Sequence, residues 1–324
     1  MDFNFYMTHY MKINDDMPIV IGYEHYSPKK VEFLKKYEGK QFIHSGNWWG
    51  LDPKKRTKEK VLENQEKMFI ERKTIGFMSM NIPASLTRPD YWNMPKKTRE
   101  KAIAACLENA TWALNNNNVK TKIFCSLEVT TYQESVTWFK KAMNEGHEAY
   151  CRGIAEFLRD PKYRKEGLKR VIEITISARK ILEDYPFHLS GIGSLYLMPI
   201  LAYLGATSLD GSTPITSALA RGTIYDENGK GFKAGSLKSW KCKCHVCNDY
   251  NEKEMINLFN KDRHFRVLHN IEIWRNEINK IKSCHDRDEL KEMIENAIKT
   301  KKSKYFERTW NETKEIIKKF LNRK

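Results

Sequence analysis

Short apolar runs that alternate with longer helical segments constrain the fold more than any other feature of this 324-residue sequence. Seven runs have the composition of buried strands, and they lie at 18–22, 41–46, 75–81, 121–128, 148–155, 187–193 and 206–211. Continuously apolar strands separated by amphipathic helices are typical of parallel sheets that helices cover. The sequence therefore predicts an α/β protein built around a parallel sheet.

Helical periodicity is clearest in the segment 165–185. One face of this segment is apolar apart from Thr175, and its members are Leu168, Val171, Ile172, Ala178, Ile181 and Leu182. Seven strands favour a (β/α)8 barrel over an open sheet, and the run FNFYM at 3–7 can supply the eighth. An open, doubly wound sheet remains the alternative.

Three cysteines lie within six residues, as Cys242-x-Cys244-x2-Cys247. The chain shows neither the layout of a signal peptide nor an apolar run of about 18 residues, so we expect a soluble, cytoplasmic protein without a membrane segment. Thiols stay reduced in that compartment, and seven cysteines is an odd number for a disulfide framework. The cluster therefore indicates a metal site, and it suits zinc better than a redox pair.

A fourth zinc ligand is expected at His269, 22 positions beyond Cys247 and within a predicted helix. His245 and His264 are the competing candidates. A Cys3His set fills the tetrahedral coordination of zinc and leaves no position for an activated water. The predicted Zn²⁺ is therefore structural, and the chemistry must lie elsewhere. We expect the other cysteines, Cys106, Cys125, Cys151 and Cys284, to be buried small hydrophobic residues.

After residue 212 the alternation of strand-like and helical runs ends, and a β-hairpin is predicted at 222–232. From about residue 251 the chain is helical and basic. We expect one domain, in which 1–222 form the main part of the barrel, 223–285 a hairpin and zinc-binding subdomain, and 286–324 basic C-terminal helices.

The net charge is +16, with 57 Lys and Arg against 41 Asp and Glu. Such a surplus produces a positive field that attracts polyanions, and nucleic acid is the polyanion that we favour. A merely solubilising surface is the alternative.

In a parallel barrel the working groups lie at the C-terminal ends of the strands. Asp210 closes the apolar run at 206–211 and precedes Gly211 and Ser212. On these residues alone, a helix-capping or turn aspartate is the simpler interpretation.

The segment HLSGIGSLYLMPILAYLGATSLDGSTPITSALARG, followed by the three cysteines and a distant histidine, resembles the tRNA-guanine transglycosylases and their DNA-acting relatives. The resemblance extends over about 41–284 and is most specific from His188 to His269. It implies a zinc-containing TIM barrel that exchanges a purine base without hydrolysis, with Asp210 as the nucleophile that traps the sugar. The family usually has Ser or Cys directly after this aspartate, whereas here Gly211 follows it.

The resemblance also implies a base pocket in which several residues differ from the family. His44 stands in place of an aspartate that assists proton transfer, and an imidazole can do this as acid or base, or can position the substrate. Asn81 stands in place of an aspartate that contacts the base, and Glu128 in place of a glutamine. The remaining expected substrate-binding residues are Ser45, Gly46, Asn47, Trp48, Gly153, Gly193 and Arg221.

The resemblance indicates less directly whether the polymer substrate is DNA or tRNA. Only Arg221 remains where the tRNA enzymes of bacteria place arginines soon after the nucleophile, so we favour DNA, as in phage-encoded relatives, with tRNA as the alternative. A free 7-deazaguanine base, such as 7-cyano-7-deazaguanine, is the expected second substrate. A zinc-stabilised nucleic-acid-binding protein without turnover is a further alternative.

Lysines and arginines after residue 251 are candidate phosphate contacts or simply a solvated surface: Lys280, Lys282, Lys291, Lys299, Lys301, Lys302, Lys304, Lys318, Lys319, Arg323 and Lys324. Members of the family often dimerise through the zinc region, so a homodimer is also expected. If a phage encodes the chain, the expected location is the host cytoplasm.

Overall fold

A computed structural model of the chain describes residues 1–8, 16–46, 56–82 and 90–321. The predictions for Asn47, Trp48, Arg323 and Lys324 lie outside the described residues.

Eight parallel strands form a closed barrel in which each strand pairs with the next along the chain and β8 pairs with β1. The strands are β1 (Asn4–Thr8), β2 (Ile19–Gly22), β3 (Gln41–His44), β4 (Thr74–Met78), β5 (Ile123–Ser126), β6 (Tyr150–Gly153), β7 (Phe187–Ser190) and β8 (Ser208–Gly211). The predicted (β/α)8 barrel is confirmed, because the run at 3–7 supplies the strand that closes it. The open sheet is therefore wrong.

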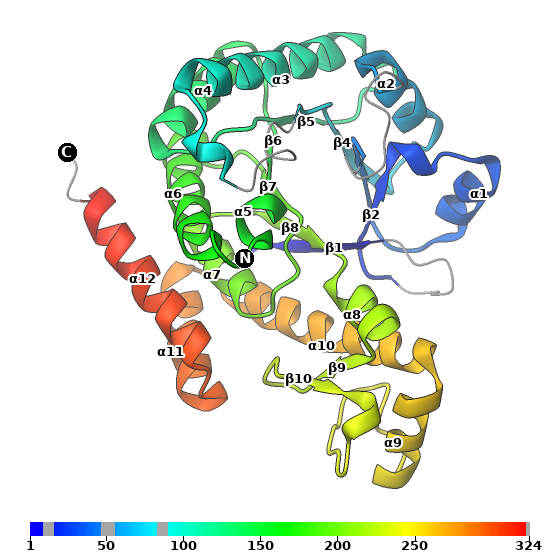
Figure 1. The fold of residues 1–324 in the computed structure, drawn as a ribbon. Coiled ribbons are helices and arrows are strands. Elements are labelled where there is room, and N and C mark those ends of the chain that lie inside the picture. Colours follow the sequence, from blue (N-terminus) through cyan, green and yellow to red (C-terminus); the bar gives the residue numbers. More distant parts are fainter. Residues whose placement is uncertain (9–15, 47–55, 83–89, 322–324) are drawn as a thin grey trace.

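Helices surround the barrel, as Figure 1 shows. They are α1 (Pro28–Lys36), α2 (Lys58–Lys67), α3 (Lys96–Asn116), α4 (Tyr132–Asn144), α5 (Ala155–Arg159), α6 (Arg164–Leu182), α7 (Leu197–Leu204) and α8 (Thr213–Arg221). Short 3-10 turns lie at Tyr23–His25, Tyr91–Asn93 and Ala234–Ser236. On α6 the predicted apolar face is buried except for the half-buried Ile181. Thr175 is accommodated there because its hydroxyl donates to the Val171 carbonyl at 2.7 Å.

The barrel interior is filled by side chains rather than open. Buried residues from six successive strands form one cluster there: Tyr6, Val20, Phe42, Met78, Phe124 and Cys151. A larger cluster of buried residues includes members of the same strands that point outward and members of the helices around them. The alternation of side chains along a strand produces these two layers. The filled interior closes the barrel below the C-terminal ends of the strands.

Beyond the barrel the chain forms a hairpin and four helices (Figure 1). The hairpin pairs β9 (Thr223–Tyr225) with β10 (Gly231–Lys233), as predicted. The helices are α9 (Glu252–Lys261), α10 (Arg263–Ser283), α11 (Arg287–Lys301) and α12 (Lys304–Leu321). The hairpin, the cysteine segment and α9 share a small core with Trp240 and Phe259.

Helix α10 joins this extension to the barrel because it packs against both α8 and β9. The Asn270 amide donates to the carbonyls of Pro214 and Thr223, and its oxygen accepts from the Tyr225 N–H. Helix α12 packs against α6. Within the described ranges, no helix combines the length and the apolar character needed to cross a membrane.

Candidate active site and metal centre

The residues predicted for the site gather at the C-terminal ends of successive strands, as the parallel barrel requires. His44 ends β3, Asn81 follows β4, Glu128 follows β5, Gly153 ends β6 and Asp210 lies near the end of β8. Their side chains are buried or half-buried, and two hydrogen-bonded networks connect them.

Asp210 lies at the centre of the first network and is 5% exposed. His188 Nε2 lies 2.9 Å from Asp210 Oδ2, and the Gly191 N–H donates to Oδ1 at 2.7 Å. Burial by itself raises the pKa of Asp210. The hydrogen bonds from His188 and from the Gly191 N–H outweigh burial and hold the pKa below its usual value. Asp210 is therefore a carboxylate at neutral pH, held through both oxygens.

His188 was not assigned a role from the sequence. It is fully buried, and its Nδ1 lies 2.9 Å from Ser208 Oγ. Because an ionised carboxylate can only accept, the His188 proton lies on Nε2, and Nδ1 accepts from the Ser208 hydroxyl. The available signal was a polar residue inside the apolar strand FHLS, two positions before Ser190 and therefore on the same face.

His44 lies close to this network from the other side of the barrel. The Gly46 N–H donates to His44 Nδ1 at 2.9 Å, so the neutral ring carries its proton on Nε2, which lies 3.1 Å from Ser190 Oγ. Burial is the largest influence and lowers the pKa of His44, while the charge of Asp210 partly offsets it. His44 is therefore neutral at physiological pH in the free protein.

The second network begins at Asn81, which donates to Glu128 Oε1 at 2.7 Å. The other carboxylate oxygen, Oε2, lies 2.8 Å from Arg152 Nη1, and both side chains are completely buried. Burial raises the pKa of Glu128, although Arg152 and Asn81 oppose the rise. Sequence reasoning missed Arg152, because an arginine on a strand gives no sign of an inward carboxylate partner.

Arg56 is a second buried arginine that the sequence did not indicate. Its Nη2 donates to the Ser45 carbonyl at 2.7 Å, and its Nη1 donates to the Asn81 carbonyl at 3.1 Å. Arg56 thereby joins the loops that follow β3 and β4. Burial lowers the pKa of Arg56 to about 10, which still leaves it charged at neutral pH.

Three glycines at the barrel mouth have different surroundings. A Cβ on Gly153 would meet only Glu156 Oε1, at 3.9 Å, so this backbone borders open space. A Cβ on Gly211 would lie 2.7 Å from the Gly193 nitrogen, and one on Gly193 would lie 2.5 Å from Thr213 Oγ1. Close backbone packing between the ends of β7 and β8 therefore explains why glycine follows Asp210.

Arg221 lies apart from these residues. It is exposed and ends α8, about 12 Å along the helix axis from Thr213, which begins α8 three residues after Asp210. Its place in the substrate site stays a prediction, as do those of Asn47 and Trp48.

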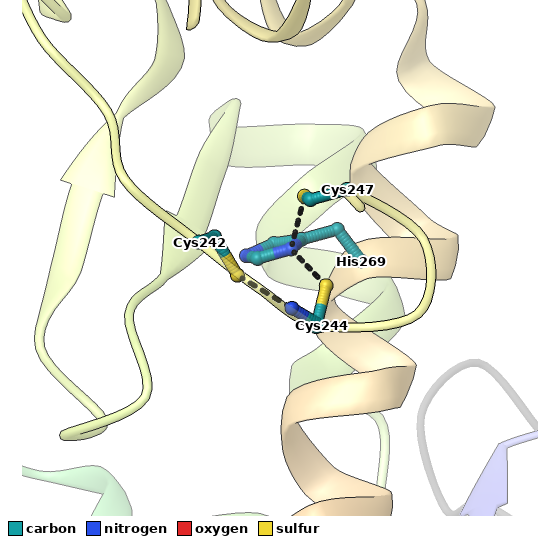
Figure 2. A group of neighbouring side chains, drawn as sticks. All are labelled: Cys242, Cys244, Cys247 and His269. Carbon is teal, nitrogen blue, oxygen red and sulfur yellow. Dashed lines mark hydrogen bonds between the residues drawn. The ribbon is translucent and has the colours of Figure 1, made fainter. Parts of the chain in front are cut away.

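The metal-ligand candidates form a compact group in the extension. One ligand atom from each of Cys242, Cys244, Cys247 and His269 lies within 4.8 Å of the others. Figure 2 shows the His269 ring between the cysteines, and its Nδ1 lies 3.4 Å from the sulfurs of Cys244 and Cys247. Cysteine and histidine atoms bound to one tetrahedral zinc lie about 3.5 Å apart. The cluster can therefore hold a metal ion.

The orientation of His269 fits the same interpretation. Its Nε2 donates to the Tyr225 carbonyl at 2.8 Å, so Nδ1 has its lone pair free for a metal. His245 and His264 are outside the group. Cys106, Cys125, Cys151 and Cys284 are buried, as predicted.

Comparison with known families agrees with this arrangement. The family model described as queuine tRNA-ribosyltransferase matches residues 90–303, more than half of the chain. The chain belongs to this family. The matched residues include Asp210, His188 and the four metal-ligand candidates, whereas His44, Ser45, Gly46 and Asn81 precede them.

Curated members of the transglycosylase group resemble the chain at low identity. The tRNA-guanine(15) transglycosylase of Methanococcus vannielii is 28% identical over 248 residues, which is 72% of this chain and 35% of that protein. The enzyme of the same name from Methanocaldococcus jannaschii is 26% identical over 74% of the chain and 35% of its own length. The enzyme of the same name from Thermococcus onnurineus is 22% identical over 81% of this chain and 43% of its own length. The chain thus spans well under half the length of these relatives.

Proposed function

We propose that this chain is a guanine transglycosylase that replaces a guanine base in a nucleic acid with a free 7-deazaguanine, such as 7-cyano-7-deazaguanine. One observation carries the proposal: a family member holds an ionised carboxylate, Asp210, at the mouth of its barrel. The names of the archaeal relatives support guanine exchange.

The first half of the reaction uses Asp210 as the nucleophile. A carboxylate oxygen forms a bond to the sugar carbon C1′ while the bond from C1′ to the guanine nitrogen breaks, and the electron pair leaves with guanine. In the second half, the nitrogen of the incoming base bonds to C1′, and the electron pair of the ester bond returns to Asp210. Positive charge that develops on the sugar is stabilised by the carboxylate at each step.

His44 is the proposed carrier of the proton that guanine gains and the incoming base loses. His44 is neutral in the free protein, so in this scheme it takes up a proton from solvent before guanine leaves. The negative charge of Asp210 raises the pKa of His44, and ester formation removes that charge. The imidazolium therefore becomes more acidic as guanine leaves. When the carboxylate returns, the pKa of His44 rises and favours uptake of the proton from the incoming nitrogen. The two pKa changes have the signs that proton exchange requires.

The base pocket is proposed to lie between Asp210 and the second network. Asn81 and Glu128 would contact the edge of the base, Gly153 and Gly193 would let it approach the backbone, and Ser45 and Gly46 would form one wall. The open space beside Gly153 supports this placement. An amide and a carboxylate together accept hydrogen bonds from the N–H groups of a guanine-like edge.

Of the two candidate polymers, tRNA is the better supported. The names of the relatives support tRNA, against the preference for DNA drawn from the sequence. DNA stays a second candidate because Arg221 is the one arginine on α8, and it lies at the far end of the helix from Asp210. Lys301 is not a free phosphate contact, since it is buried against Glu277 at 3.1 Å. The other basic residues of the extension remain candidates.

We propose structural Zn²⁺ as the metal of the Cys3His group, where it would fasten the cysteine segment and the hairpin to α10. Four protein ligands leave it no role with substrate. On this basis 1–222, 223–285 and 286–324 would form the barrel, the zinc-binding subdomain and the C-terminal helices. A homodimer, a cytoplasmic location and a phage origin stay predictions from the sequence.

Exchange of labelled guanine tests the function. The purified protein and Asp210→Asn are each incubated with isotope-labelled guanine and with tRNA, single-stranded DNA or duplex DNA. We expect label to enter one polymer with the wild type, and Asp210→Asn to lose roughly 10⁴-fold or more of the rate. The labelled polymer identifies the substrate. Binding of a polymer without labelling of any would instead favour a binding protein without turnover.

A further inference from the structure

Asp210 does not stand alone: a buried chain of polar groups runs from it into the barrel interior. His188 Nε2 lies 2.9 Å from Asp210 Oδ2, and the Ser208 hydroxyl lies 2.9 Å from His188 Nδ1. Both His188 and Ser208 are buried, and the register pairs them directly across β7 and β8. His188, Ser208 and Asp210 are therefore held in place by strands β7 and β8 and not by a loop.

The surroundings of His188 leave it no contact with the substrate, so that among the reacting groups it touches only Asp210. Its ring packs edge-on against three aromatic rings of the barrel interior, with centroid distances of 5.9 Å to Tyr6, 4.7 Å to Phe42 and 6.4 Å to Phe124. With both nitrogens engaged and the ring enclosed, His188 has no route to the substrate. It can act on the reaction only through Asp210.

We propose that His188 is a positioning residue that makes Asp210 a good leaving group in the second half of the exchange, when the sugar is released from the protein. This inference rests on the proposed nucleophilic role of Asp210. In that step the bond between C1′ and the carboxylate oxygen breaks, the bond between C1′ and the incoming nitrogen forms, and the electron pair returns to the carboxylate. The proton of the incoming nitrogen goes to His44.

The physical reason is the difference between an ester and a carboxylate as hydrogen-bond acceptors. A hydrogen bond to an ionised acceptor is markedly stronger than one to a neutral acceptor. The His188 N–H therefore stabilises Asp210 after release more than it stabilises the covalent intermediate. It favours expulsion of the carboxylate, and the Ser208 hydroxyl keeps the proton of His188 on the nitrogen that faces Asp210.

Removal of the donor should also change the acid limb of the pH profile. The titratable groups that face this pair from other strands are His44, Cys151 and Tyr6. Without His188, burial would dominate and raise the pKa of Asp210, since the hydrogen bond that lowers it would be lost. Adduct formation should then fail at a higher pH than in the wild type.

The test compares His188→Leu, which lacks a donor, with His188→Gln, whose amide can donate, and with Phe42→Leu, which creates space in the same interior without removing a polar group. A covalent adduct with an oligonucleotide substrate is formed in the absence of free 7-deazaguanine. The base is then added, and the decay of the adduct is followed on denaturing gels across a pH series.

We expect the adduct of His188→Leu to decay roughly 10- to 100-fold more slowly than that of the wild type, the range for loss of a charge-assisted hydrogen bond. His188→Gln should recover part of the rate, and Phe42→Leu should keep the wild-type lifetime and acid limb. Equal lifetimes and pH profiles in His188→Leu and wild type would overturn the proposal, and so would equal slowing in Phe42→Leu. Absence of any adduct in the wild type would instead refute the nucleophilic role of Asp210. Should His188→Leu fail to fold, His188→Met serves the same comparison.

Discussion

The metal cluster and the barrel mouth both gather polar side chains, but in opposite ways. Three of the four metal-ligand candidates lie within six residues of sequence, and His269 comes from helix α10. The residues around Asp210 come from the ends of six strands, β3 to β8, which lie between residues 41 and 211. One site depends on local spacing, and the other depends on the register of the barrel.

The two regions also differ in whether their side chains keep lone pairs that a substrate could reach. His269 uses one nitrogen on the Tyr225 carbonyl, and its other nitrogen faces the sulfurs, so a bound metal would be enclosed by protein. Asp210 has one hydrogen bond to each oxygen, and each oxygen can accept two. The cluster is thus suited to stabilising the fold, whereas Asp210 keeps lone pairs that can form a new bond. Four comparisons between variants test this division.

The largest effect on stability is expected from loss of the metal. Cys247→Ser should lose bound zinc, and the melting temperature should fall by roughly 5–10 °C, because several kcal/mol of binding energy no longer stabilise the folded extension. Zinc content by elemental mass spectrometry and a thermal melt measure this. Cys284→Ser is the matched control, since Cys284 is buried outside the cluster. An unchanged melting temperature in zinc-free Cys247→Ser would contradict a structural metal.

A smaller loss is expected at the barrel mouth from Arg152→Met. This change leaves the Glu128 carboxylate buried without its partner, at a cost of about 3–5 kcal/mol. The folded pKa of Glu128 would then lie well above its unfolded value, so the variant should be most stable at low pH and lose stability as the pH rises through that folded value. Urea unfolding between pH 5 and pH 8 measures the trend.

The double variant Arg152→Met with Glu128→Gln is the control for this charge. It should recover much of the lost stability and flatten the pH dependence. Equal pH trends in the single and double variants would show that the buried carboxylate is not the cause.

The sequence predicted the metal cluster better than the barrel mouth, for a physical reason. Cysteine spacing within one segment limits the possible ligands directly, whereas His188 and Arg152 gain their roles from partners on other strands. The strands themselves were predictable, because buried parallel strands are continuously apolar. Their register was not, because the pairing of His188 with Ser208 is set by how β7 and β8 lie against each other in three dimensions. Gly211 was read as a departure from the family, and the close approach of Gly193 explains it only in three dimensions.

Substitutions at two glycines of the barrel mouth distinguish a role in packing from a role in substrate binding. Gly211→Ala should cost about 1–3 kcal/mol, because its Cβ would lie 2.7 Å from the Gly193 nitrogen. Gly153→Ala should leave stability within about 0.5 kcal/mol but raise the KM for the free base roughly tenfold, since its methyl group would enter the open space. Denaturation and exchange kinetics measure both. A normal KM in Gly153→Ala would remove Gly153 from the base pocket.

The smallest effect concerns acid stability. The folded pKa of Asp210 lies below its usual value, so its contribution to stability is present above the unfolded pKa and is lost as the pH falls through the folded pKa. The stability difference between wild type and Asp210→Asn should be constant from pH 5 to 7 and change below about pH 4. Urea unfolding at closely spaced pH values detects this. A difference that changes near neutral pH would contradict an ionised Asp210.

Mass spectrometry of the covalent intermediate tests the central claim most directly. The wild-type protein is incubated with its polymer, denatured, and digested with protease and nuclease before peptide mapping. The account predicts a sugar-phosphate remnant on the peptide that contains Asp210, and on no other peptide. A remnant attached to a different residue, or base exchange that proceeds at the wild-type rate in Asp210→Asn, would contradict it.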